Sequence, residues 1–440
     1  MRTSIPLQNT AAQPTPALRR SEAASGVIAL NWPLLILIFA LPLQNIYLGK
    51  LPNLGAGINF INVMLLAAFV VWKTRPELSA PSDTLMHRPL YAYMAILAVS
   101  ALYGIAFLGE LGQEHLHILK DQLTPMFLFF IVLNSVRDRR AVIAVLIGTC
   151  LPLPYMFRVF YSQYASVSSW HYDDDVRLVN GTFMTLGSNE IAAFYAAYTL
   201  ILIALLYYVK HSKARLALLL LVPTSLYCLM YSHSRGSWIA FVAGGAVLAW
   251  YTSKKLAVVL AMAALLLGGP ALHLLPVSVQ ERVESIVVDE HEKRDASAEL
   301  RFVIWSIAMR EYQKSPIFGI GLHSFHHVNP YQGRDAHSYF VRVLTEQGAV
   351  GILLLALVFS RSACIARRLA RSAADPLFKA LGAGMLGVIA AVVAGNFFGD
   401  RFSHYPLSSY YWVYLALTAR ALQICQAQAA GTQQDRRVTP

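Results

Sequence analysis

Residues 231–245 read YSHSRGSWIAFVAGG and set Arg235 between two apolar runs, each long enough to enter a lipid bilayer. A guanidinium near hydrocarbon costs at least a few kcal/mol, so an arginine held at such a position is a candidate for function. The structural alternative is that Arg235 only caps its helix or extends its charge to the lipid headgroups. The stretch therefore indicates a membrane protein with a charged group at the end of a span.

The composition of the 440-residue chain supports this interpretation. Hydrophobic residues make up 56% of it and charged residues 14%, which is typical of a polytopic membrane protein. The polar start of the chain reaches Arg19 and Arg20 before the first apolar run at Val27, without a small-residue cleavage site, so we expect the first helix to stay as an anchor. The four cysteines lie in or beside apolar runs without C-x-x-C spacing, which indicates packing residues.

About 12 apolar runs have the length that crosses a bilayer as a helix, so the sequence predicts an all-α, polytopic integral membrane protein. Between the runs, most of the 36 lysines and arginines fall on the side that holds both termini. By the positive-inside rule that side is the cytoplasm, so the excess of 12 positive charges orients the protein and does not indicate nucleic acid. The runs are 27–44, 58–73, 90–109, 122–136, 141–156, 191–209, 216–232, 237–252, 256–275, 348–363, 380–398 and 409–424.

These runs divide the chain into five segments, with two long loops on the outer face. Long outer loops of a many-span protein are where a site for an outer substrate is built. In the larger loop, VSVQERVESIVV and SAELRFVIWSIAMREYQ carry apolar residues at helical spacing, which predicts two helices along the membrane surface. The segments are a cytoplasmic tail (1–26), helices 1–9 (27–275, with a periplasmic loop at 157–190), the large periplasmic catalytic loop (276–347), helices 10–12 (348–424) and a cytoplasmic tail (425–440).

Three arginines and one histidine on the outer face are the candidate site residues: Arg177, Arg235, Arg301 and His337. Arginine stays protonated at physiological pH and offers a planar fork of donors, so several arginines around one pocket favour an anionic ligand such as pyrophosphate. An imidazole with an ordinary pKa of about 6.5 can accept a proton from an attacking hydroxyl, which suits His337 to the role of general base. The structural alternative pairs Arg301 with Glu299 and Arg177 with the aspartates just before it.

Other polar residues on the outer face carry weaker signals. Glu190, Ser338 and Glu346 lie near the candidates in sequence and are expected to support them. The aspartates of HYDDDVR could hold a divalent cation, but such a run is more often a solvated loop, and arginines neutralise pyrophosphate without metal. We therefore expect no metal and no cofactor. The three aspartates are Asp173, Asp174 and Asp175, and the histidines expected to be structural are His115, His117, His211, His323, His326, His327 and His404.

The order of four motifs resembles the O-antigen ligase family, which shares a superfamily with the Wzy-type polymerases. The resemblance implies an inverting glycosyltransferase of the GT-C type in the bacterial inner membrane, with both termini cytoplasmic and a periplasmic active site. It implies transfer of O-antigen from undecaprenyl pyrophosphate to a sugar hydroxyl of the lipid A core in lipopolysaccharide, without ATP or metal. The motifs are RLVNGTFMTLGSNEIAAF (177–194), SHSRGSW (232–238), PIFGIGLHSF (316–325) and DAHSYFVRVLTEQGAVG (335–351).

Carried over by position, the resemblance assigns Arg235, Arg301 and Arg177 to the pyrophosphate and makes His337 the essential histidine. The family often shows His-Asn at this place, where the chain has His337 followed by Ser338. The expected partners are the lipid-linked glycan donor, the lipid A core oligosaccharide acceptor and membrane lipid, with no nucleic acid. Three alternatives remain open: a Wzy-type polymerase, a protein O-glycosylation ligase and, from a different class, a polysaccharide transporter.

Overall fold

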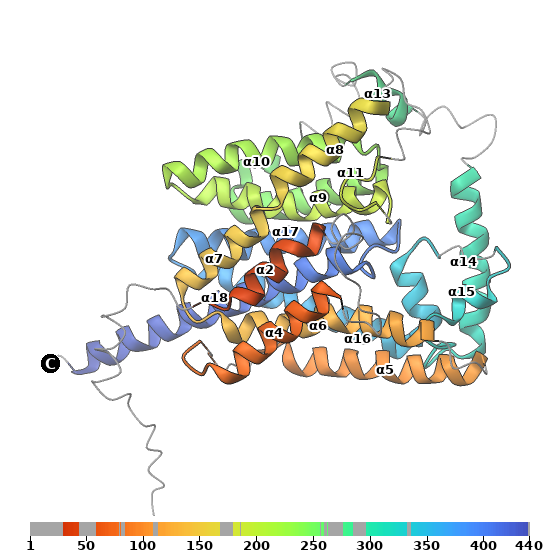
Figure 1. Ribbon diagram of the computed structural model, residues 1–440, viewed down its shortest axis with the longest axis horizontal. Helices are drawn as coiled ribbons and strands as arrows, with labels where there is room; N and C mark the ends of the chain where they lie inside the picture. The colour runs from red at the N-terminus through yellow and green to blue at the C-terminus, as the bar shows by residue number, and fades with distance from the viewer. Residues whose placement is uncertain are drawn as a thin grey trace, which may run out of the picture.

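The protein is a bundle of long helices, and every regular element in the described part of the chain is a helix (Figure 1). The computed structural model describes residues 30–43, 59–78, 80, 84–108, 113–167, 179–184, 186–255, 257–258, 262, 276–284, 296–331 and 336–438. The all-α class expected from the apolar runs is confirmed for these ranges.

Seven helical segments of the described chain are long and apolar enough to cross a membrane. They are α5 (His87–Leu108), α6 (Gln113–Ser135), α7 (Arg139–Cys150) continued by α8 (Leu153–Val167), α9 (Ser188–Tyr208), α10 (Ser212–Tyr231), α16 (Tyr339–Ser372) and α17 (Pro376–Phe397). Two shorter apolar helices are α2 (Trp32–Ala40), extended by the 3-10 turn η1 (Leu41–Leu43), and α4 (Phe60–Thr74). The chain is therefore a multi-pass membrane protein.

Two further long helices, α11 (Arg235–Thr252) and α18 (Tyr405–Val438), complete the bundle. Each expected apolar run overlaps one of these helices except the run at 256–275, which lies largely outside the described residues; only seven of the helical segments meet the length and hydropathy of a span. The fifth expected span differs in its bounds, because helix α8 continues to Val167 and so extends into the loop expected from residue 157.

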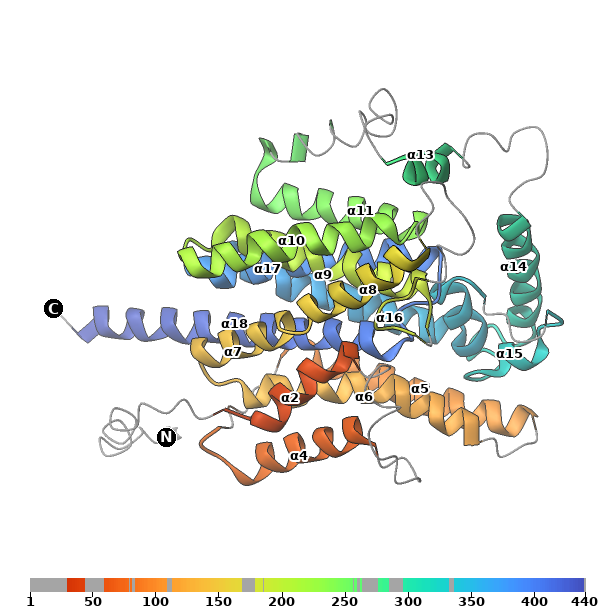
Figure 2. The same ribbon diagram turned by 45° about the horizontal axis from the view of Figure 1, so that its top comes forward.

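The bundle has two sides with a middle layer between them (Figures 1 and 2). Helices α9, α10 and α11 form one side, and α2, α4, α5 and α6 form the other. Helices α16, α17 and α18 lie between: α17 packs on α9 and α11, whereas α16 packs on α5 and α18 on α6. The two sides are thus joined through the C-terminal third of the chain.

Small residues bring α17 and α11 into backbone contact. A Cβ atom built at Gly244 of α11 would lie 2.6 Å from the carbonyl oxygen of Gly387 in α17. Nearer the start of α11 and the end of α17, a Cβ at Gly395 would lie 3.2 Å from the Cβ of Ala240. Such small-residue faces let membrane helices approach more closely than larger side chains allow. The start of α11 and the end of α17 are therefore fixed against each other.

The PIFGIG segment locks α5 to α16. Gly319 and Gly348 both have positive φ angles (74° and 66°), and a side chain on either would collide with the backbone of the other's segment. The amide of Gly321 donates to the carbonyl of Glu346 (3.0 Å), and that of Leu322 donates to Ser100 of α5 (2.9 Å). Gly348 also interrupts the helical geometry of α16, so that α16 changes direction where the tenth apolar run begins.

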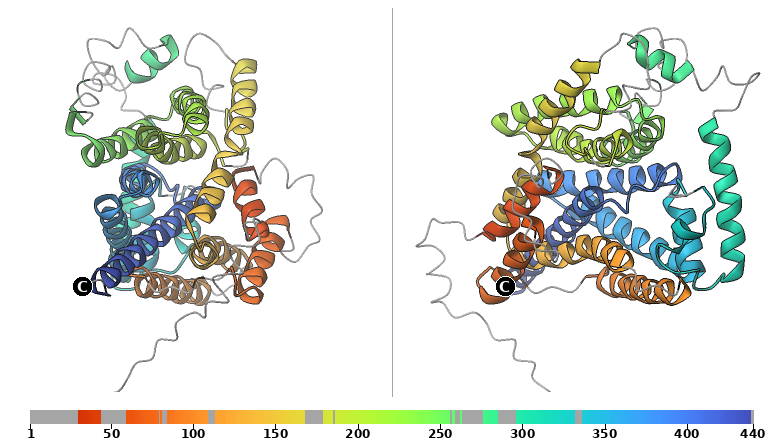
Figure 3. Two further views of the ribbon diagram at one scale, coloured as in Figure 1. Left: turned by 90° about the vertical axis from the view of Figure 1, so that its left-hand side faces the viewer. Right: turned by 45° about the vertical axis from the view of Figure 1, so that its right-hand side comes forward.

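Three helices of the expected outer loop lie at the same end of the bundle: α13 (Val277–Glu284), α14 (Ala296–Lys314) and α15 (Ser324–Val328). Helix α14 runs across the ends of the bundle helices (Figures 1 and 3). Its buried residues Ile304 and Ala308 pack with Ile320 and Phe325 of the segment that follows. We call this the α14 end of the bundle.

Candidate active site

A buried arginine lies in the turn between α17 and α18, at the α14 end. Arg401 is 5% exposed. Its Nη1 donates to the hydroxyl of Ser237 (2.9 Å) and its Nη2 to that of Ser234 (3.5 Å). Its Nε has no hydrogen-bond partner among the described residues. The guanidinium is thus held by hydroxyl groups and forms no ion pair with any described carboxylate, so its buried charge has no direct counter-ion.

The first turn of α11 supplies those hydroxyls. Ser234 is the N-cap of α11, but its hydroxyl makes no capping hydrogen bond to the first turn and is directed to other side chains. Its hydroxyl donates to Oδ1 of Asn189 at the start of α9 (2.8 Å) and also lies 3.0 Å from the Ser237 hydroxyl. Arg235 follows as the first residue of α11 and is half-buried.

Glycine leaves room for Arg401 on this turn. A Cβ at Gly236 would lie 3.2 Å from Nη2 of Arg401, so the guanidinium rests against the backbone next to Arg235. The N-terminus of a helix carries a partial positive charge, which adds to that of the guanidinium. Positive electrostatic potential is therefore concentrated at this point.

Two charged residues from other helices act on Arg401. Burial lowers the pKa of Arg401 to about 10; the Glu190 carboxylate of α9 opposes this shift, and the Arg301 guanidinium of α14 adds to it. Arg301 is therefore close enough to Arg401 for the two charges to repel. Glu190 also lies 4.0 Å from Nε2 of His404, so helices α9, α14 and α18 all contribute to this charged region.

His337 lies beside the same turn. Its backbone is left-handed (φ 49°), which is uncommon for a non-glycine residue and is found where surrounding contacts impose it. The two residues after His337 make such contacts. The hydroxyl of Ser338 donates to the carbonyl of Asn396 (3.3 Å), and the amide of Tyr339 donates to the carbonyl of Gly399 (3.2 Å). His337 is thus attached to the α17–α18 turn that carries Arg401.

A buried ion-pair network fastens α16 to that turn. Nη1 of Arg342 lies 2.9 Å from Oδ2 of Asp400, and its Nε lies 4.0 Å from Oε2 of Glu346. Glu346 was expected to support the site, and in the structure it contributes to this network. Ser338, also expected to support the site, is the N-cap of α16 and accepts a hydrogen bond from the amide of Val341.

Comparison with known families gives a match within the central part of the chain. Residues 220–356 match the family model described as O-Antigen ligase. We call this matched segment, residues 220–356, the ligase domain. The match confirms the resemblance noted in the sequence and supports a relation to the glycan ligases and polymerases. No curated protein matches the chain.

The ligase domain contains three of the four residues expected at the site. Arg235 begins α11, Arg301 lies in α14, and His337 precedes α16. Arg235 is adjacent in sequence to Ser234 and Gly236, the charge of Arg301 acts on Arg401, and the two residues after His337 bond to Asn396 and Gly399. Arg177 and the aspartates at 173–175 lie outside the described residues.

Arg401 was not expected from the sequence and lies beyond the ligase domain. The signal was present, because FFGDRFSH places an arginine between the last two apolar runs, the same pattern that marked Arg235. The spacing gives no indication that residue 401 reaches the start of α11. Asn396, whose Oδ1 accepts from the amides of Arg401 and Phe402, is a second such residue.

His233, which precedes the arginine motif in the ligase domain, is a buried neutral group. It is 2% exposed and left-handed (φ 54°). Burial, followed by the charge of Arg282, lowers the pKa of His233 to about 4. Nε of Arg282 donates to the carbonyl of His233 (3.3 Å), so α13 is joined to the turn before α11.

Two cavities of the described structure, one small and one large, lie at different ends of the bundle. A cavity of about 20 Å³ adjoins Arg401 and Asn396, enough for one water molecule. A cavity of about 750 Å³ lies instead between α5, α16 and α18, at the opposite end from Arg401, and is bordered by Arg88, Arg361 and Arg368. The larger of these two cavities is therefore not the one beside Arg401.

Proposed function

We propose that the protein is an O-antigen ligase of the GT-C type. It transfers a glycan from undecaprenyl pyrophosphate to a sugar hydroxyl of the lipid A core during lipopolysaccharide biosynthesis. The observation that carries the proposal is Arg401: a buried guanidinium with hydroxyl partners, near Arg301 and at the positive end of α11. A site with this much positive charge favours a multiply charged anion, and the pyrophosphate of the lipid-linked donor is such a group.

The arginines bind the leaving group in this proposal. Negative charge grows on the pyrophosphate as the bond between the anomeric carbon and its oxygen breaks. Preorganised guanidinium donors stabilise that charge most effectively where water is scarce. Arg235, Arg301 and Arg401 take this role, with Arg177 as a further ligand predicted from the sequence. They supply positive charge without a metal or ATP.

His337 is the proposed general base. A sugar hydroxyl is a weak nucleophile, and a base within hydrogen-bond reach accelerates its attack by about 10²- to 10⁴-fold. The hydroxyl oxygen bonds to the anomeric carbon, its proton passes to the His337 imidazole, and the pyrophosphate leaves with the bonding electron pair. Because attack and departure occur on opposite sides of the carbon in one step, the product has inverted configuration.

The proposal includes an orientation in the bacterial inner membrane. Both termini face the cytoplasm, and the α14 end faces the periplasm, where the donor lipid and the lipid A core meet. The basic residues of the loops at the other end support this orientation. The polyprenyl chain remains in the bilayer while its diphosphate lies at headgroup depth.

The test is transfer by the purified protein in detergent, where no gradient across a membrane exists. Lipid-linked O-antigen and lipopolysaccharide that ends at its core are mixed with the protein, and products are separated by gel and mass spectrometry. We expect O-antigen on the lipid A core and free undecaprenyl pyrophosphate. If the lipid-linked glycan is elongated and the core stays unmodified, the protein is a polymerase and not a ligase. Absence of any new glycosidic bond would contradict the proposal.

A further inference from the structure

A second group of titratable and metal-binding side chain types, which shares no residue with the surroundings of Arg401 described above, lies where the start of α6 meets α15. Glu114 and His115 come from α6, and His323, His326 and His327 come from α15 and the residue before it. The ring centroid of His323 lies 4.8 Å from that of His326 and 5.2 Å from that of His327. The ring of His115 stacks on that of His327 at 5.7 Å. Four of the 13 histidines in the chain are thus gathered in one place.

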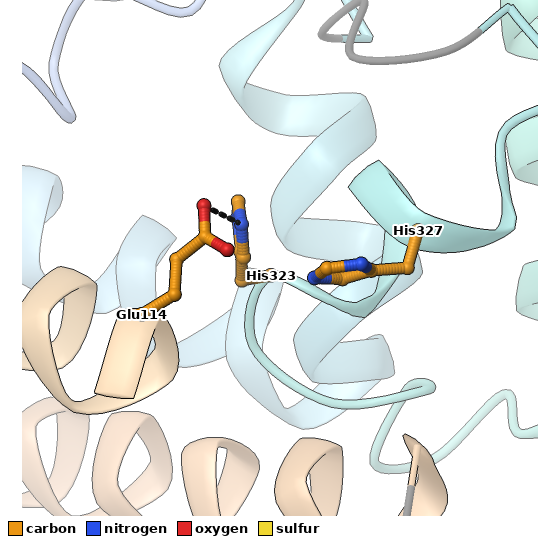
Figure 4. A group of neighbouring side chains, drawn as sticks. All are labelled: Glu114, His323 and His327. Carbon is orange, nitrogen blue, oxygen red and sulfur yellow. Dashed lines mark ion pairs between the residues drawn. The ribbon is translucent and has the colours of Figure 1, made fainter. Parts of the chain in front are cut away.

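Three of these side chains face one another in the manner of metal ligands. Figure 4 shows the carboxylate of Glu114 beside the ring of His323, with the ring of His327 directed toward both. Oε1 of Glu114 lies 3.1 Å from Nε2 of His323. The ligand atoms of Glu114, His323 and His327 all lie within 4.8 Å of one another. Ligands around a tetrahedral zinc ion are about 3.3 Å apart, so small side-chain rotations would close the set.

The buried imidazole of His115 is an independent observation that points to a ligand. His115 is 2% exposed, and neither of its ring nitrogens has a hydrogen-bond partner among the described residues. Burying a polar ring without a partner is unfavourable, and native proteins rarely leave such groups unsatisfied. A cation bound between the rings of His323 and His327, against which His115 packs, would accept its lone pair.

The chemical nature of these side chains also suits a metal. Two or three imidazoles with one carboxylate are a donor set suited to zinc, whereas magnesium and calcium prefer oxygen ligands.

We propose that Glu114, His323 and His327 bind a zinc ion, with His115 or His326 as a further ligand. The ion would join the start of α6 to the segment between α14 and α16. That segment also contains the glycines that lock α5 to α16, so the metal would be a structural connection at the α14 end. It is separate from the arginines and from His337, and the inference does not depend on the proposed transfer reaction.

The test is zinc binding by the full-length protein, stripped with a chelator and then titrated with zinc alone in a calorimeter. We expect about one zinc ion per chain for the unsubstituted protein. His323→Asn should weaken binding at least about 100-fold, because it removes a direct ligand. Asparagine tolerates the left-handed backbone of His323 (φ 63°), so this substitution is compatible with the fold. The matched control is His117→Asn, an exposed histidine of α6 that should bind zinc as the unsubstituted protein does.

A second variant and a second signal make the result decisive. Glu114→Gln keeps the shape of the side chain, removes its charge, and should also weaken zinc binding. Cobalt, substituted for zinc, should show visible absorption bands from nitrogen ligands that disappear in His323→Asn but remain in His117→Asn. The proposal is wrong if the unsubstituted protein binds no zinc. It is also wrong if Glu114→Gln and His323→Asn both bind as tightly as the control.

Discussion

Two buried arginines, one just before α18 and one within it, have similar exposure but different hydrogen-bond acceptors. Arg401, before the helix, is 5% exposed, and Arg420, within it, is 6% exposed. Arg420 donates from Nε to the carbonyl of Leu133 (3.0 Å) and also donates to the carbonyl of Ala80, so backbone oxygens occupy its guanidinium. Arg401 has only serine hydroxyls as side-chain hydrogen-bond partners among the described residues, and the charges of Glu190 and Arg301 act on it in opposite directions. Burial alone therefore does not separate a structural arginine from a ligand-binding one; the acceptors do.

The sharpest way to break this comparison is to remove Arg401. Arg401→Ala should lower the rate of glycan transfer about 10³-fold, because one preorganised donor to the developing charge contributes about that much. Its unfolding midpoint should change little, since the bonds lost are to hydroxyls. The measurements are transfer by the purified variant and its thermal unfolding in detergent. A variant as active as the unsubstituted protein would remove Arg401 from the site.

Removing His337 should separate binding from chemistry. His337→Ala should slow transfer about 10²-fold through loss of the base, while its affinity for lipid-linked pyrophosphate stays within about twofold. Arg401→Ala should weaken that affinity. Single-turnover transfer and donor binding, measured on both variants, check the difference. Equal loss of donor affinity in the two variants would show that His337 acts by holding the donor.

Arg420→Ala tests the structural half of the comparison. It leaves the carbonyls of Leu133 and Ala80 without a donor, and each unsatisfied buried group costs about 1–3 kcal/mol. The unfolding midpoint should fall by several degrees, while transfer measured well below that temperature remains near normal. If activity falls and stability does not, the two arginines are not distinguished by their acceptors.

The smallest expected effect comes from a single methyl group. Gly236→Ala places a Cβ 3.2 Å from Nη2 of Arg401 and should displace the guanidinium slightly, with a loss of transfer below about tenfold. Gly245→Ala is the matched control on the same helix, because its Cβ would meet nothing within 4 Å. Equal activity of the two variants would show that the position of Arg401 tolerates the shift.

Sequence reasoning anticipated the parts of the molecule that depend on local pattern. Apolar runs predicted the helices, and an arginine between two runs drew attention to Arg235. The same pattern at Arg401 was missed because its significance depends on α17 packing against α11, which the sequence does not encode in any short stretch. The histidine group was missed for a similar reason: Glu114 and His323 are far apart in the chain and meet only because PIFGIG docks on α5 and α16.

The contact between Gly244 and Gly387 has a consequence for the reaction itself. Serine hydroxyls at the start of α11 and the guanidinium just after α17 belong to one backbone-to-backbone unit that extends through Ala240 and Gly395. A diphosphate bound there would contact a rigid pair of helices. Donors already in position need no rearrangement as charge moves onto the departing oxygen. The close contact between the glycines of α11 and α17 would therefore keep the leaving-group site preorganised.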